Sequence, residues 1–152
     1  MSYITPRGLD DLNYFYFYLL NYLQVNRYQV ESDHPQIIAN STAALDIFGE
    51  ARRKGSDVTQ AEEEAMSVLF TNIGESEYNI VTEILLENFR DTIDLDCEAA
   101  VEYWTPQIMT DIPNLFDGFD RMAIGVDPLD LDTMKNKIVG SIVTYLSDNG
   151  LQ

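Results

Sequence analysis

The feature that most constrains this chain is the spacing of its apolar residues, which recur every three or four positions along most of its length. Such a period places apolar side chains on one face of an α-helix, whereas a half-buried strand needs strict alternation. Only 8 Gly and 5 Pro interrupt the 152 residues, so long helices can form between them. The pattern predicts an all-α fold, a single compact bundle of about six helices with no significant sheet, forming one domain over residues 1–152.

Local start and stop signals set the expected ends of these helices. Thr59 and Glu62 stand at capping-box spacing, while Ser76 and Asp94 are placed to cap the two helices that follow. The third and fourth helices should form a tight hairpin, and Pro106 should kink or split the fifth. The expected helices cover residues 9–26, 35–54, 59–74, 76–89, 94–108 and 130–149.

The inward faces of these helices give the expected hydrophobic core. In the last helix, Gly140 has no side chain and would allow a close helix crossing. Between the last two helices, residues 112–128 should form a short turn of helix around Leu115 and Phe116 and then an irregular connection. The expected core contains Leu12, Leu19, Leu23, Leu45, Phe48, Leu69, Phe70, Leu85, Phe89, Trp104, Ile138, Ile142 and Leu146.

The charge balance excludes several classes of partner. Against 9 Lys and Arg stand 26 Asp and Glu, a net charge of −17. A chain this acidic is repelled by a phosphate backbone and by anionic lipid headgroups, and its longest apolar run, residues 14–20, is too short to span a bilayer. We therefore expect no direct nucleic-acid binding and no membrane association. The acidity can serve solubility, or it can imitate the phosphate array of DNA and occupy the basic groove of a DNA-binding enzyme.

Residues able to carry catalysis are scarce in this sequence. His34 precedes a proline at a helix start and is expected to be a surface or capping imidazole, and Cys97 is the single cysteine. One cysteine forms no intrachain disulfide, which together with the absence of a secretory signal pattern favours a cytoplasmic protein. Glu83, Glu87 and Asp91 lie one helical turn apart, but helix bundles that bind two metals through carboxylates usually add a His one turn after a Glu. We expect no catalytic residue, no cofactor-binding residue and no metal ligand.

The first helix is unusually rich in aromatic residues, with Tyr14, Phe15, Tyr16, Phe17, Tyr18 and Tyr22. Because successive helical residues turn by about 100°, these rings point around nearly the whole circumference. Either the helix is central and covered on all sides, or part of its surface meets another protein or a second copy of the chain. Tyr14, Tyr18 and Tyr22 lie at intervals of four and share one side, which makes them the candidate interface residues.

Short motifs spread over most of the chain resemble a known family. They include residues 20–23, Gly55 with residues 60–62, residues 68–70, Ser76 and Tyr78 with residues 84–85 and 87–89, and residues 140–143, 145–146 and 149–151. In this order they resemble a family of short, acidic proteins with a domain of unknown function, associated with conjugative transposons and related mobile elements of Bacteroidetes. The resemblance implies a helical fold and a mobile-element setting, and it implies no catalytic residue.

Together with the resemblance, these observations predict a non-enzymatic accessory or protein-interaction module of a mobile genetic element. We expect it to need no cofactor and to bind a protein partner or a second copy of the chain. An acidic DNA-mimic inhibitor of a DNA-binding enzyme is the alternative prediction, and a carboxylate metal-dependent enzyme is the third. The first two differ in the salt dependence of binding, because an aromatic interface tolerates salt and a charge mimic loses affinity as salt is raised.

Overall fold

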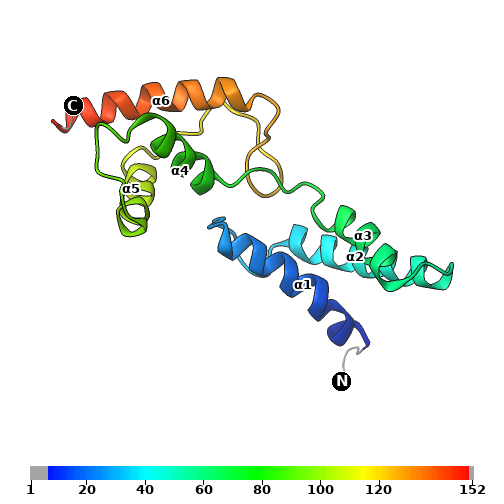
Figure 1. Cartoon of the computed structure of the whole chain (residues 1–152). Coiled ribbons are helices and arrows are strands. Elements are labelled where there is room, and N and C mark those ends of the chain that lie inside the picture. The colour runs from blue at the N-terminus through cyan, green and yellow to red at the C-terminus, as the bar shows by residue number, and fades with distance from the viewer. Residues whose placement is uncertain (1–6, 151–152) are drawn as a thin grey trace. The chain divides into compact units, whose positions relative to one another are not determined.

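The fold is built from helices alone. A computed structural model describes residues 7–150, with side chains described from residue 14 onward, so the Leu12 side chain lies outside the described residues. The helices are α1 (Arg7–Val25), α2 (Pro35–Arg53), α3 (Val58–Leu69), α4 (Glu77–Asn88), α5 (Glu98–Asp111) and α6 (Leu131–Asp148) (Figure 1). Between residues 7 and 150, β-pairing is limited to two isolated bridges. The predicted all-α fold of about six helices is confirmed.

Backbone contacts divide the chain into two compact units. Unit 1 comprises Met1–Val25 and Gln29–Ile73 and contains α1, α2 and α3. Unit 2 comprises Asn26–Tyr28 and Gly74–Gln152 and contains α4, α5 and α6. The expectation of one domain over the whole chain stays a prediction. None of the described helices has the length and apolar character needed to cross a membrane.

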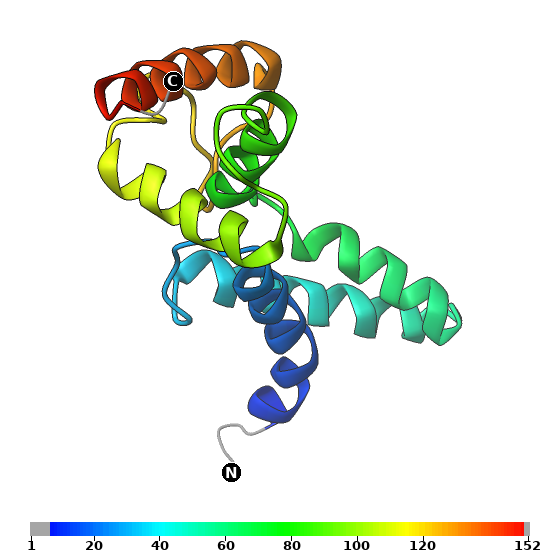
Figure 2. The same cartoon turned by 60° about the vertical axis from the view of Figure 1, so that its left-hand side comes forward.

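In unit 1, α2 packs against both α1 and α3. The close pair α2 and α3 runs side by side as a helical hairpin (Figure 2). Small buried residues on the two helices, Ala44, Ala51, Ala61 and Ala65, let their backbones approach. The predicted hairpin of the third and fourth helices is therefore wrong, since α3 and α4 belong to different units.

The start of α3 also differs from the expectation. Its N-cap is Asp57, whose carboxylate accepts a hydrogen bond from the Gln60 backbone N–H at 2.8 Å, and the Gln60 side chain accepts one from the Asp57 N–H at 3.3 Å. This reciprocal capping box replaces the one predicted for Thr59 and Glu62. Gly55 follows the end of α2 and has a φ of 100°, which a continuing helix does not allow. The next helix can therefore begin only after Gly55.

In unit 2, α4 packs against α5 and α6. Ser76 caps α4 as predicted, accepting a hydrogen bond from the Asn79 backbone N–H at 3.2 Å. The N-cap of α5 is Cys97 instead of Asp94, and Pro106 lies inside a helix that continues to Asp111. Asp94 instead accepts a hydrogen bond from the Asp96 N–H at 3.0 Å, closing a turn before the helix.

Two further expectations in unit 2 are corrected. Residues 112–119 form successive hydrogen-bonded turns that bury Leu115 and Phe116, without a helical segment. Gly140 lies on an exposed side of α6, and a Cβ added there would meet no atom within 4 Å. It therefore mediates no close helix crossing.

The short segment Asn26–Tyr28, which follows α1, is held by unit 2. The Tyr28 hydroxyl donates to the Gly74 carbonyl at 2.6 Å, and the Ser76 hydroxyl donates to the Asn26 carbonyl at 2.6 Å. Gly125 packs so closely here that a Cβ would lie 2.7 Å from the Glu75 carbonyl oxygen and 3.1 Å from the Tyr28 ring. These contacts explain why the segment belongs to unit 2.

The predicted core is confirmed at most of its described positions. Leu45, Phe48, Phe70 and Trp104 are only half-buried. The remaining described members are buried, namely Leu19, Leu23, Leu69, Leu85, Phe89, Ile138, Ile142 and Leu146.

Candidate protein-interaction surface

The candidate surface is an exposed side of α1, here called the aromatic face. Its exposed fractions are 52% for Tyr14, 54% for Phe17, 47% for Tyr18, 39% for Tyr22 and 67% for Val25. At 100° per residue these positions span roughly 140° of the helix circumference. The structure therefore places Tyr14, Tyr18 and Tyr22 on one side, as their spacing predicted. Phe17 and Val25 extend the face and were not singled out from the sequence.

The opposite side of α1 is the packed one. Phe15, Leu19 and Leu23 are buried, and the Phe15 ring centroid lies 5.9 Å from that of Phe48 in α2. A helix covered on all sides is therefore not what the structure shows. Large apolar side chains are therefore buried on one side of α1 and exposed on another.

Contacts with α3 hold the three tyrosines in place. The Tyr14 hydroxyl donates to the Glu62 carboxylate at 2.7 Å, and this hydrogen bond raises the pKa of Tyr14 above its ordinary value. Tyr18 and Tyr22 both meet the Phe70 ring edge to face, with centroids 6.4 Å and 4.9 Å away. Rings fixed in this way lose little conformational entropy when a partner covers them.

Phe17 has a different kind of support. Its ring packs on Tyr16, with centroids 5.0 Å apart, and the Tyr16 hydroxyl donates to the Ser32 carbonyl at 2.9 Å. Phe17 thus stands on the outer side of α1 with more than half of its surface exposed. Substitution there changes the exposed surface more than it changes the packing of unit 1.

The charged residues of α3, which contacts the aromatic face, are all acidic. The sequence from Asn13 to Asn26 has no charged residue, while α3 carries Glu62, Glu63 and Glu64 and no Lys or Arg. Described cations of unit 1 cluster at the end of α2, where Arg53 lies 2.9 Å and Lys54 3.8 Å from the Glu50 carboxylate. The hydrogen bond from Arg53 lowers the pKa of Glu50. These cations are engaged locally, so the face is apolar with an acidic border.

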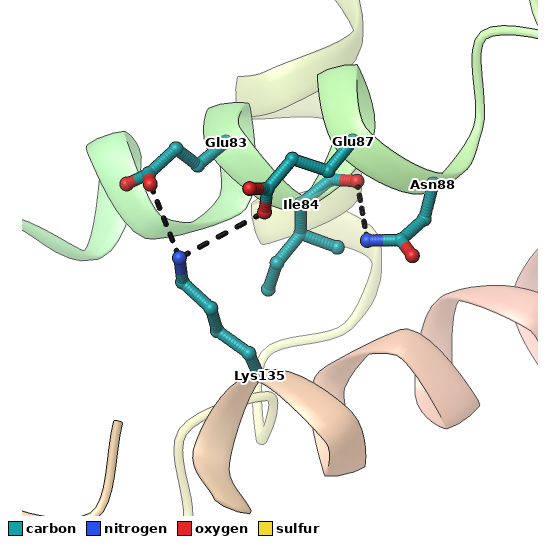
Figure 3. A network of polar contacts seen from close by, with 5 residues as sticks. All are labelled: Glu83, Ile84, Glu87, Asn88 and Lys135. Atoms are coloured by element: carbon teal, nitrogen blue, oxygen red, sulfur yellow. Dashed lines mark hydrogen bonds and ion pairs between the residues drawn. The ribbon is translucent and has the colours of Figure 1, made fainter. Parts of the chain in front are cut away.

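Two of the three carboxylates considered for a metal site, Glu83 and Glu87, contact a lysine, and α4 ends at Asn88, before Asp91. Lys135 of α6 places its Nζ 3.1 Å from Glu83 Oε1 and 3.8 Å from Glu87 Oε1 (Figure 3). The Lys135 side chain is only 20% exposed, and its hydrogen bond with Glu83 raises the Lys135 pKa. An ammonium between two carboxylates stands where a metal ion would have to bind. Among the described residues, no three His, Cys, Asp or Glu side chains are grouped to hold a metal.

The single histidine and the single cysteine, His34 and Cys97, lie in different units. His34 is the N-cap of α2, and its Nδ1 accepts a hydrogen bond from the Gln36 backbone N–H at 3.0 Å, as the capping prediction implied. Cys97 is exposed at the start of α5 and makes no side-chain cap bond.

One polar contact of unit 2 had no signal in the sequence. The Tyr145 hydroxyl of α6 donates to Asp111 Oδ2 at 2.5 Å, and Gln107 Nε2 donates to the same oxygen at 2.9 Å. The Asp111 hydrogen bond raises the pKa of Tyr145 to about 12, and the same bond lowers that of Asp111. The contact joins the ends of α5 and α6, which lie 34 residues apart in sequence.

Comparison with known proteins adds a family and a fold. The model of the family described as Domain of unknown function (DUF1896) matches residues 8–151. No curated protein matches the chain. Among solved structures, the crystal structure of protein PG0816 from Porphyromonas gingivalis is similar, with a TM-score of 0.70 and 22% identity. That match covers 94% of this chain and 95% of the other, and it shows a shared fold.

Proposed function

Because this chain belongs to the DUF1896 family, whose function is unknown, we propose from its geometry that it is a non-enzymatic protein-interaction module. The observation that carries the proposal is the aromatic face of α1, where Tyr14, Phe17, Tyr18 and Tyr22 are all exposed. Tyr is enriched at protein interfaces because the ring offers apolar area and the hydroxyl stays solvated. Rings already fixed by Glu62 and Phe70 are suited to binding.

The wider setting is part of the same proposal. The resemblance to mobile-element proteins supports an accessory role in such an element. The single Cys97 and the net charge of −17 are compatible with a cytoplasmic protein. The Lys135 contact with Glu83 and Glu87 weighs against the carboxylate metal-dependent enzyme, since that pair already has a cation.

The test compares the parent protein with the triple variant Tyr14→Ser, Tyr18→Ser, Tyr22→Ser and with the single variant Phe17→Ser. Pull-down from host cytosol with mass spectrometry reports partners, and sedimentation velocity reports self-association. We expect both variants to lose the partner or the oligomer while circular dichroism shows retained helix. Tyr103→Ser is the matched control, because Tyr103 is 59% exposed on α5 and lies outside the face.

Two other outcomes are informative, and the second of them contradicts the proposal. If the triple variant unfolds, its tyrosines are needed for folding, and the Phe17→Ser variant then decides the question alone. If folded Phe17→Ser keeps every partner and the oligomeric state of the parent, the aromatic face is not the interface.

A further inference from the structure

The aromatic face has the dimensions of a helix-binding surface. Its residues follow one side of α1 at helical intervals from Tyr14 to Val25, a rise of roughly 16 Å at 1.5 Å per residue. An amphipathic helix that binds such a face presents apolar anchors at intervals of three and four along a similar length. The face therefore matches about three turns of a partner helix.

The border of the face specifies the charge of that partner. Glu62 lies at the face through its hydrogen bond with Tyr14, and the exposed Glu63 follows it on α3, whereas Glu64 lies about 200° around the helix from Glu62. Within the described parts of α1 and α3 no Lys or Arg side chain balances these carboxylates. The exposed faces of tyrosine rings also attract cations, and Lys and Arg can lay their apolar stems along them.

A second copy of the chain is a poor occupant of the same surface. Each copy carries a net charge of −17, and a two-fold contact through the face would bring two acidic surfaces together. Like-charge juxtaposition opposes both the encounter and the docked state. The same argument applies to an acidic protein partner.

We propose that the aromatic face of α1 binds a basic amphipathic helix of another protein, with apolar anchors on the tyrosines and cationic side chains against the carboxylates of α3. This inference rests on the proposed function and adds the chemical class of its partner. Apolar area supplies affinity at the centre of the contact, and the charged border supplies orientation and a faster encounter.

The test titrates the full chain with three synthetic peptides of about 15 residues, long enough for the helical anchors. One is a Leu and Lys peptide with its leucines at amphipathic helical spacing. The second replaces every Lys by Glu, and the third has the first composition in scrambled order. Fluorescence anisotropy at low and high salt reports the dissociation constants. We expect the basic amphipathic peptide to bind at least about tenfold tighter than either other peptide.

Variants of the chain separate the face from its border. The triple variant Glu62→Gln, Glu63→Gln, Glu64→Gln should bind the basic peptide about tenfold more weakly, and its affinity should depend less on salt. Its matched control, Asp91→Asn, Asp117→Asn, Asp148→Asn, changes the net charge equally in unit 2 and should leave the affinity within about twofold of the parent. Phe17→Ser should weaken binding while leaving the salt dependence in place.

Each of the other outcomes contradicts the proposal that the partner is a basic amphipathic helix. Equal affinity for the basic and acidic peptides would show an apolar interface without charge selection, and the proposed function would stand. Equal affinity for the amphipathic and scrambled peptides, or equal effects of the two carboxylate triples, would show adhesion to a general acidic surface. Absence of peptide binding also overturns the inference, whereas the proposed function is decided separately by the pull-down with Phe17→Ser.

Discussion

At the scale of single residues, the contact between Tyr145 and Asp111 shows how a short hydrogen bond sets ionisation. A phenol that donates to a carboxylate must lose that bond and gain repulsion when it ionises, so its pKa rises. The Tyr145 pKa of about 12 lies above the ordinary value of 10.0. The bond therefore contributes its full stability below about pH 10, and that contribution is lost as the pH rises toward about 12.

We expect Asp111→Asn to return the Tyr145 pKa to near its ordinary value. At pH 11, Tyr145 should be about one tenth ionised in the parent chain and about nine tenths ionised in the variant. Carbon-13 NMR of labelled tyrosine rings measures this, with Tyr145→Phe identifying the resonance. The control is Asp117→Asn, which removes an exposed carboxylate of the same unit and should leave the titration unchanged. An unchanged midpoint in Asp111→Asn would contradict the assigned cause.

At the scale of elements, the start of α3 tests which of two overlapping motifs caps a helix. Asp57→Ala should lower the free energy of unfolding by about 0.5–2 kcal/mol, because it removes the carboxylate that satisfies the Gln60 N–H. Thr59→Ala, two residues later, should change it by less than about 0.5 kcal/mol. Urea unfolding followed by circular dichroism measures both. Equal losses would mean that Thr59 also stabilises the helix start.

The same two motifs show what the sequence could and could not predict. The existence of the helices and most of the buried core follow from local apolar spacing, which is why Leu85, Ile138 and Ile142 were identified correctly. Asp57 with Gln60 and Thr59 with Glu62 both have capping-box spacing, so the choice depends on where Gly55 turns the chain. Local pattern alone does not supply that turn.

Which helices pack together depends on contacts between residues far apart in the sequence, and no local pattern identifies these contacts. The sequence suggested a hairpin of the third and fourth helices because Gly74 stands between them. In the structure, the backbone N–H of Glu75 donates to the Val126 carbonyl at 2.8 Å, which keeps the chain extended there. At the candidate surface, the four-residue spacing of Tyr14, Tyr18 and Tyr22 predicted a shared side. Their support by Glu62 and Phe70, far along the chain, could not be predicted.

At the scale of the whole molecule, the question is whether the two units unfold together. The chain passes between them three times, after Val25, after Tyr28 and after Ile73. If one unit unfolds, the chain ends of the folded unit at these three crossings are no longer held by structure on the other side. Unfolding of one unit should therefore destabilise the other. We expect one cooperative transition, in keeping with the predicted single domain.

Two core substitutions test this expectation. Leu69→Ala in unit 1 and Leu85→Ala in unit 2 remove fully buried side chains, and each should cost about 2–5 kcal/mol. Differential scanning calorimetry should show a single peak that moves down in both variants. Leu129→Ala is the control, because Leu129 is 81% exposed and its loss should cost less than about 0.5 kcal/mol. Two peaks, each sensitive to one substitution, would show that the units unfold independently.

The docking of Asn26–Tyr28 on unit 2 also sets an order of events during synthesis. Ribosomes release a chain from its N-terminus, so Tyr28 emerges long before Gly74 and Gly125, the residues that surround it. Helices α1, α2 and α3 can therefore associate while the segment between α1 and α2 still lacks its binding site. Unit 2 closes only after residue 126 has left the ribosome, which makes this early segment one of the last parts of the protein to reach its native contacts.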